Sequence, residues 1–128
     1  MATQKEVAYI QVPNVAQAYL VDQCICYDTN GRAVDPADTS GYVYAGTCLQ
    51  AVASATQDTV KVPVMPPSEA NRFQKVTLTG ATQADVGELS YFTGVSTVTK
   101  SVGNGVKAGL IVALLGTNLV LIDTMRTL

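Results

Sequence analysis

The chain contains no histidine and no tryptophan, and only 14% of its 128 residues are charged. Without histidine, neither a Ser-His nor a Cys-His pair can activate a nucleophile, and the usual imidazole ligand of zinc is missing. The formal net charge of −2 gives no basic surface for a nucleic-acid backbone. A surface with so few charges must consist largely of neutral polar and apolar side chains, a composition suited to contacts with other proteins.

Long hydrophobic runs are also lacking. The most apolar stretch, residues 106–122, is interrupted by Lys107 and by Gly116-Thr117-Asn118, whereas a membrane helix needs about 20 apolar residues in a row. The first residues show no apolar segment behind a basic start, which a secretory signal would have. We therefore expect a protein that is made and folded in a cytoplasm and that has no membrane partner.

Cysteine is sparse, at three residues: Cys24, Cys26 and Cys48. Alternation along a strand would place Cys24 and Cys26 on one face, either as a metal or redox pair or as small buried side chains. A tetrahedral zinc site would need a fourth ligand, so we expect no metal. The odd count and cytoplasmic synthesis argue against a disulfide, although one to Cys48 stays an alternative.

The carboxylates follow no catalytic pattern. Most of them fall in turns or at strand ends, where Asp commonly caps the backbone. Asp28-Thr29-Asn30-Gly31 begins like a calcium-binding loop, but Arg32 stands at the fifth position and no Glu closes a twelve-residue loop. No Ser-x-x-Lys or Gly-x-Ser-x-Gly motif is present. The sequence therefore predicts no catalytic residue, no cofactor-binding residue, no metal ligand and no enzymatic activity.

What is abundant is β-strand signal. β-branched and aromatic residues gather in short runs separated by Gly, Pro, Asn and Asp. Asn30-Gly31 between two such runs predicts a hairpin, because both residues accept positive φ, and Pro63 marks an edge strand or a strand end. We expect an all-β fold, a small β-sandwich or β-barrel. The predicted strands span residues 20–27, 32–34, 42–45, 47–53, 58–64, 73–78, 88–93, 97–101, 106–115 and 119–122.

Two halves of the chain resemble each other, with Pro66-Pro67 and the polar residues after it as a linker. The aligned segments are Val21–Asp28 with Val86–Thr93, Ala45–Leu49 with Ala108–Val112, and Asp58–Met65 with Asn118–Met125. This predicts one β domain over residues 17–128, made of two similar lobes, the duplicated halves 17–65 and 73–128. Few aligned positions are identical, so a chance likeness of two β-meanders is the alternative.

Residues 1–16 are predicted to form an N-terminal arm. They include Val7, Tyr9, Ile10 and Val12 but show no regular period. Apolar side chains are unfavourable in water, so we expect the arm to pack on another chain, with Tyr9 and Ile10 as anchors. The alternative is a first strand over Val7–Val12 that pairs within the domain.

Tyr42 and Tyr44 lie on one side of a predicted strand, and Tyr27 and Tyr91 occupy matching positions in the two halves. Aromatic rings can stack on nucleic-acid bases, but no basic stripe accompanies these. Packing in a core or an interface explains them better. Tyr42 and Tyr44 therefore join the N-terminal residues as expected contacts with a protein partner or another subunit.

Four segments resemble one family. Asp22–Asp28 and Gly87–Phe92 are similar to the Gly-Asp-hydrophobic-Val-Tyr-hydrophobic strands of capsid decoration proteins of tailed bacteriophages, also called cement or head-stabilising proteins. Val43–Thr47 and Val106–Leu110 resemble the hydrophobic-x-Ala/Val-Gly strands of the same proteins. The likeness covers residues from about 20 to 122 and rests on short motifs.

The resemblance implies a structural virion protein on the capsid exterior, made in the host cytoplasm. It implies binding to the major capsid protein, stabilisation by bridging of capsomers, and self-association as a homotrimer, with a dimer as the second choice. It implies no nucleic-acid partner and carries over no catalytic residue. Two other classes fit a small β protein: a β-domain subunit of another phage or cell-surface appendage, such as a tail or adhesin, and a small-ligand-binding β-barrel.

Overall fold

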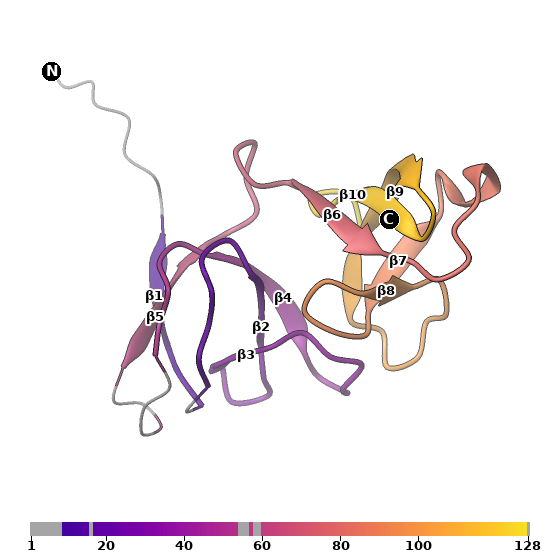
Figure 1. The fold of residues 1–128 in the computed structure, drawn as a ribbon. Helices are drawn as coiled ribbons and strands as arrows, with labels where there is room; N and C mark the ends of the chain where they lie inside the picture. Colours follow the sequence, from indigo (N-terminus) through magenta and orange to yellow (C-terminus); the bar gives the residue numbers. More distant parts are fainter. Residues whose placement is uncertain (1–8, 16, 54–56, 58–59, 128) are drawn as a thin grey trace, which may run out of the picture.

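The chain folds into two β lobes that lie side by side (Figure 1). A computed structural model describes residues 9–15, 17–53, 57 and 60–127. Each lobe contains one five-stranded antiparallel sheet, and no α-helix occurs in the described part of the chain. The predicted all-β fold is confirmed.

Lobe 1 has the strand order β1-β5-β4-β2-β3. Its strands are β1 (Ile10–Pro13), β2 (Cys24–Tyr27), β3 (Ala33–Val34), β4 (Val43–Cys48) and β5 (Lys61–Met65). A parallel bridge between Asn14 and Ala33 joins the end of β1 to β3, so the sheet curls into a small barrel. Apolar side chains fill the barrel: Val12, Tyr19, Ile25, Ala33, Ala45, Cys48, Val52, Val62 and Val64.

Lobe 2 repeats this arrangement in the order β6-β10-β9-β7-β8. Its strands are β6 (Phe73–Thr77), β7 (Leu89–Phe92), β8 (Val98–Thr99), β9 (Lys107–Gly116) and β10 (Leu119–Asp123), with a 3-10 turn η1 (Gln83–Asp85) before β7. A parallel bridge between Thr77 and Thr97 closes it in the same way. Its interior is formed by Val76, Leu78, Phe92, Val98, Val106, Ala108, Ile111, Val120 and Ile122.

The lobes also share a backbone irregularity. A bulge interrupts the β2–β4 pairing, and an equivalent bulge interrupts the β7–β9 pairing. At each bulge lies a glycine with positive φ, Gly46 at 140° and Gly109 at 155°. A Cβ atom on Gly46 would overlap the carbonyl oxygen of Met65, and one on Gly109 that of Asp123. Strands β1 to β5 therefore correspond one by one to strands β6 to β10.

The structure corrects the alignment of the last strand in each half. Thr47 pairs with Met65 in lobe 1, and its equivalent Leu110 pairs with Asp123 in lobe 2. Met65 thus corresponds to Asp123 and not to Met125, an error of two residues. The register follows the buried apolar positions of the strand, which must all face the barrel interior, rather than the shared methionine.

The N-terminal arm predicted over residues 1–16 is wrong for the part that the structure describes. β1 pairs with β5, with Ile10 opposite Val64 and Val12 opposite Val62. This pairing confirms the alternative, a strand that pairs within the domain, for residues 10–13. It also satisfies backbone groups on one side of β5 that would otherwise be unpaired. The first half of the repeat accordingly begins at β1 rather than at residue 17. Residues 1–8 and 16 lie outside the described residues.

β5 is an interior strand, not the edge strand that Pro63 suggested. The Pro63 carbonyl accepts a hydrogen bond from the Leu49 amide at 2.8 Å, on the side where β4 has already ended at Cys48. Because the N–H and C=O of a strand residue point to the same side, the missing proline N–H removes no bond between β4 and β5.

The two barrels are joined through one continuous apolar cluster. Cys24, Cys26 and Val34, which lie on the outside of the lobe 1 barrel, pack with the interior residues of lobe 2. The Tyr44 ring lies 5.3 Å from the ring of Phe92 in lobe 2, centroid to centroid. The outer side of lobe 1 therefore packs on the core of lobe 2, while the lobe 1 barrel has its own interior, and this packing is expected to hold the lobes in a fixed arrangement.

Polar contacts tie the linker to both lobes. The Asn71 side chain donates to Thr47 Oγ1 and to the Met65 carbonyl, both at 3.0 Å, and so holds lobe 1. Arg72 donates two hydrogen bonds to the Asp123 carboxylate, at 2.9 and 2.5 Å, and so holds lobe 2. The linker is thus a fixed part of the structure.

A second bridge between the lobes lies away from the linker. The Asn104 backbone amide in lobe 2 donates to Asp38 Oδ1 in lobe 1 at 2.8 Å, and the Asn104 side chain donates to the Asp38 carbonyl at 2.9 Å. Two separated attachments restrict rotation of one lobe against the other more than one linker can.

Candidate interaction surfaces

The predicted N-terminal contact residues have different environments in the structure. Tyr9 is 49% exposed and Ile10 is 41% exposed, at the start of β1. Val12 is only 3% exposed and lies inside the lobe 1 barrel, so its prediction as a contact residue is wrong. Alternation places Ile10 and Val12 on the same face of β1, so their difference follows from position along the strand: Val12 lies opposite the buried Val62, whereas Ile10 is the first residue of β1. Val7 lies outside the described residues.

Tyr42 and Tyr44 lie at the junction of the two lobes and not on a free face. Both pack against the apolar cluster that the lobes share. Burial raises the pKa of the Tyr44 phenol, and its hydroxyl lies 3.9 Å from Cys24 Sγ. Tyr44 in particular is already in contact with Phe92, so the prediction of a partner contact at these two tyrosines is replaced by a role in joining the lobes.

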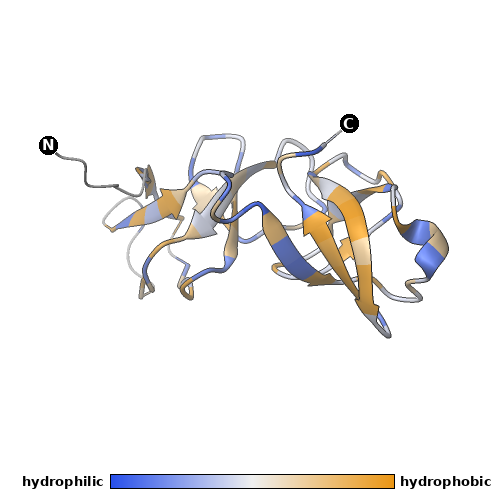
Figure 2. Cartoon of the chain, turned by 90° about the horizontal axis from the view of Figure 1, so that it is seen from above, coloured by the Kyte–Doolittle hydropathy of each residue, from blue (hydrophilic) through white to orange (hydrophobic). Residues whose placement is uncertain are grey.

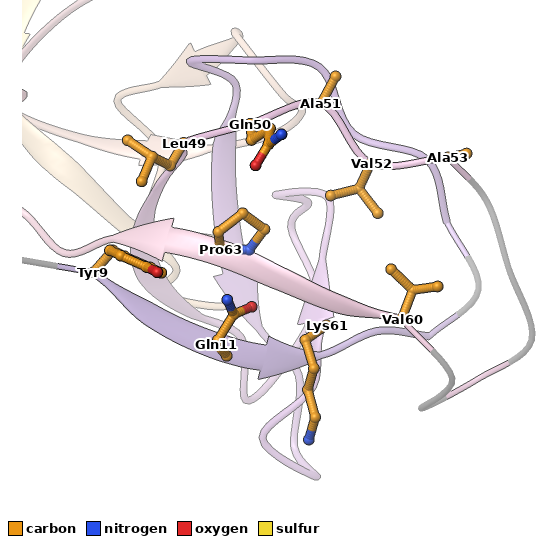
Figure 3. A pocket seen from close by; sticks show the side chains of 10 residues that line it. All are labelled: Tyr9, Gln11, Leu49, Gln50, Ala51, Val52, Ala53, Val60, Lys61 and Pro63. Carbon is orange, nitrogen blue, oxygen red and sulfur yellow. The ribbon is translucent and has the colours of Figure 1, made fainter.

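A groove lies on the outer face of β1 and β5, beside the segment that leaves β4 (Figure 3). Its volume is about 500 Å³. The side chains that line it are mostly apolar or amide, and they are Tyr9, Gln11, Leu49, Gln50, Ala51, Val52, Ala53, Val60, Lys61 and Pro63. Of these lining residues, only Lys61 carries a charge, so the groove suits adhesion of an apolar or weakly acidic segment rather than a reaction.

Sequence reasoning missed this groove because it expected a strand through residue 53. β4 ends at Cys48, and the chain then crosses to Tyr19, with which Val52 forms an isolated antiparallel bridge. The backbone amide of Val52 donates to the Tyr19 carbonyl at 2.9 Å, and the reverse bond has the same length. No short-range pattern links residues so far apart in the sequence, so only the folded chain reveals the groove.

The most buried charged groups serve the fold. Asp123 is 1% exposed, and its hydrogen bonds from Arg72 hold the pKa of that carboxyl below its usual value. Asp85 is 4% exposed, and hydrogen bonds from Lys100 and the Thr82 amide lower its pKa in the same way. A paired carboxylate with a lowered pKa is a poor general base, because it holds its proton weakly.

The three cysteines are free and buried. Burial raises the pKa of Cys24 to about 11 and that of Cys26 to about 12, and it also raises the pKa of Cys48. Thiolate is the reactive form, so these thiols behave as small apolar side chains at neutral pH. Among the described residues, no three His, Cys, Asp or Glu side chains converge in a way that could hold a metal ion.

Comparisons with known proteins identify no relative. No family model, no curated protein and no solved structure matches the chain. Within the described part of the chain, no helix has the length and apolarity needed to cross a membrane. The functional argument therefore rests on the surfaces of the molecule itself.

Large apolar side chains are exposed on both lobes. Those in lobe 1 and the linker region include Tyr9, Ile10, Leu20, Val21, Val43 and Val60, and those in lobe 2 are Phe73, Val102, Leu115 and Met125. Figure 2 shows that apolar residues run along the strands of both lobes, most fully in the lobe that carries the C-terminus. Single exposed apolar side chains are ordinary on a folded protein; here they leave apolar area on both lobes that a protein partner could cover.

Proposed function

We propose that the protein is a structural component of a phage virion that binds the outside of the capsid and stabilises it by bridging capsomers. The observation that carries this proposal is the pairing of two barrels through one apolar cluster, with exposed apolar residues on both. A bridging protein must contact two neighbouring subunits at a fixed spacing. Two lobes that cannot rotate freely would meet that requirement.

The start of β1 is the part of lobe 1 that we assign to the capsid. Tyr9 and Ile10 are exposed apolar residues, and Tyr9 also lines the 500 Å³ groove beside Pro63. Burial of one such side chain stabilises a complex by roughly 1.5–3 kcal/mol. Many copies bound to one shell would add these modest contributions over the whole capsid.

The two other classes of function have less support. Both barrel interiors are filled by side chains, with Ile25, Val62 and Phe92 at 0% exposure, so a small ligand would have to bind outside the barrels. An appendage subunit would use the same exposed apolar residues, and it differs from a capsid protein only in its partner. The partner therefore has to be identified by experiment.

Co-sedimentation tests the proposal. Purified protein is mixed with empty capsids of the phage or prophage whose genome encodes the chain, and with tails from the same phage as a control. We expect it to pellet with capsids at a saturating stoichiometry and to raise the temperature at which the capsids break open. Saturable binding to tails, or no binding to either particle, would overturn the proposal.

A pair of variants tests the assigned contact. Tyr9→Lys with Ile10→Lys should weaken capsid binding at least about tenfold, because two charges would enter an apolar contact. The matched control is Gln83→Lys with Ala84→Lys, two exposed positions in lobe 2, which adds the same charge and should leave binding unchanged. Equal binding by both variants would exclude the start of β1 as the contact.

A further inference from the structure

A cavity of about 280 Å³ lies at the junction of the two lobes, and we call it the junction cavity. Lobe 1 lines it with Tyr42, Val43 and Tyr44, and Pro67 of the linker continues that wall. Both tyrosines also pack against the apolar cluster at the junction, where the Tyr44 ring contacts Phe92. One wall of the cavity is therefore aromatic and aliphatic, and the packing of the lobes fixes its position.

Lobe 2 provides the opposite wall, which is more polar. Lys107 at the start of β9 and Thr124 and Thr127 after the end of β10 line it, together with Gly105. Thr124 is 4% exposed, and its hydroxyl donates to the Arg72 carbonyl at 2.9 Å, so it lies on the buried side of the cavity. Gly105 and Lys107 are exposed and lie near the mouth.

Three donor groups in the junction cavity have no acceptor. Within the part of the chain that the structure describes, no hydrogen bond or ion pair is made by the Lys107 ammonium, the Tyr42 hydroxyl or the Thr127 hydroxyl. Arg72 and Lys100, by contrast, are paired with carboxylates. None of the described lining residues is acidic. The cavity therefore combines positive charge and hydrogen-bond donors with an apolar wall, and it contains no anion of its own to match them.

The volume and the single charge restrict what fits. The 280 Å³ of the cavity is the share of roughly nine water molecules at ~30 Å³ each, and it lies just below the range of about 300–1,000 Å³ that drug-sized ligands occupy. One ammonium balances one negative charge, which suits a carboxylate better than a polyphosphate. The wall formed by Val43 and Pro67 requires an apolar group beside that charge.

We propose that the junction cavity binds one carboxylate group attached to a small apolar body. The carboxylate accepts hydrogen bonds from Lys107, Tyr42 and Thr127, and the apolar body packs on Val43 and Pro67. Two sources carry this chemistry: a free aromatic or aliphatic monocarboxylate, and an acidic side chain of a partner protein. The proposal goes beyond the capsid assignment and does not depend on it.

Titration of the purified full chain with phenylacetate, followed by heteronuclear NMR, tests the site. We expect saturable shifts of the Val43, Gly105 and Lys107 amide signals, with a dissociation constant of about 1 mM or tighter, as the binding per atom of small ligands permits. Phenylacetamide has nearly the same shape but no charge. It should bind at least about tenfold more weakly, because the charge-assisted hydrogen bonds are lost.

Variants of single side chains test the assigned donors. Lys107→Met should weaken phenylacetate binding at least about tenfold. The matched control is Lys75→Met, which removes the same charge at another exposed strand position of lobe 2 and should bind like the wild type. Tyr42→Phe removes one hydroxyl and should weaken binding about two- to tenfold. The amide spectrum of each variant reports directly whether it is folded.

A capped peptide, acetyl-Gly-Glu-Gly-amide, distinguishes the two sources, because it presents its carboxylate as a partner protein would. Tighter binding of phenylacetate supports a free monocarboxylate, and tighter binding of the peptide supports a partner side chain. The proposal is overturned if neither probe saturates the shifts by about 20 mM, if phenylacetamide binds as well as phenylacetate, or if Lys107→Met binds like the wild type. No capsid is present in these titrations, so their failure leaves the proposed function untouched.

Discussion

The two lobes differ most where the fourth strand of each sheet passes to the fifth. In lobe 2, β9 is 10 residues long and returns as β10 after the short turn at Thr117 and Asn118, where Asn118 has a φ of 58°. In lobe 1, β4 ends at Cys48 and β5 begins only at Lys61. Leu49–Ala53 and Val60 of the longer connection line the groove beside β1. Two lobes with the same strand order can thus differ at one connection, and in lobe 1 that connection contributes to a groove.

The lobes also differ in how far the outward-facing side chains of the corresponding strands β2 and β7 are covered. Small residues occupy the covered face of lobe 1, where Cys24 and Cys26 allow lobe 2 to approach closely. Leu89 and Tyr91 occupy the accessible face of lobe 2. Two lobes of the same topology can therefore have similar cores and different contact surfaces.

Removal of β1, the strand of lobe 1 that corresponds to β6 in lobe 2, should have the largest effect on stability. Deletion of residues 2–14 should unfold lobe 1, because β5 loses its partner and the barrel loses Val12. Deletion of residues 2–8, which leaves β1 in place, should keep the fold. Circular dichroism and urea denaturation measure both. A cooperative, native-like transition in the longer deletion would show that β1 is not part of the lobe.

Substitution of the bulge glycines tests whether the lobes are equivalent. Gly46→Ala and Gly109→Ala should each destabilise the protein by about 3 kcal/mol, because positive φ and overlap with a carbonyl oxygen act together. Gly116→Ala is the control, since no atom lies within 4 Å of a Cβ there, and it should change stability by less than about 0.5 kcal/mol. Very different losses at Gly46 and Gly109 in urea denaturation would break the equivalence.

The linker ion pair should have a smaller effect. Arg72→Met leaves the buried Asp123 carboxylate without its partner and should lower Tm by roughly 5–10 °C. Glu69→Gln removes only the exposed end of the network, 78% exposed at its side chain, and should leave Tm nearly unchanged. Equal Tm values for the two variants would show that the Arg72–Asp123 ion pair does not stabilise the protein.

The stabilisation by the Arg72–Asp123 ion pair should decrease at acidic pH. The pKa of Asp123 is lowered in the folded protein, so its stabilising contribution is present above the unfolded pKa, near 4, and is lost as the pH falls through the lower folded pKa. The wild type should therefore lose its advantage over Arg72→Met progressively as the pH falls below about 4. A Tm difference that stays constant as the pH is lowered would contradict the assignment.

The smallest effect is expected at the cysteines. Cys26→Ala should cost about 1 kcal/mol and Cys48→Ala a similar amount, because only packing is lost. The pKa is raised to about 11 for Cys24 and to about 12 for Cys26. We therefore expect a thiol reagent at pH 8 to label these cysteines no faster than the protein unfolds locally around them. Rapid labelling of the native protein would show that the thiols are accessible.

Much of the fold could be predicted from the sequence, because it depends on local patterns. Runs of β-branched and aromatic residues between turn residues such as Asn30-Gly31 predicted strands at the positions of β2 to β10. β4 was however predicted as two strands, residues 42–45 and 47–53, and is one strand that continues through Gly46. The Ala45-Gly46 and Ala108-Gly109 pairs were aligned correctly, since each glycine lies at the bulge of its own lobe. The composition also restricted the chemistry, because a chain without histidine has few ways to activate a nucleophile.

Tertiary structure alone decided which apolar residues are covered. Sequence reasoning treated Tyr9, Val12 and Tyr44 as equivalent contact residues, yet one is exposed, one lies in a barrel and one joins the lobes. The pairing of β1 with β5 and of Tyr19 with Val52 spans tens of residues, and no short-range pattern encodes it. Alternation determines which side chains share a face, but only the packing of one lobe on another determines whether that face meets water or protein.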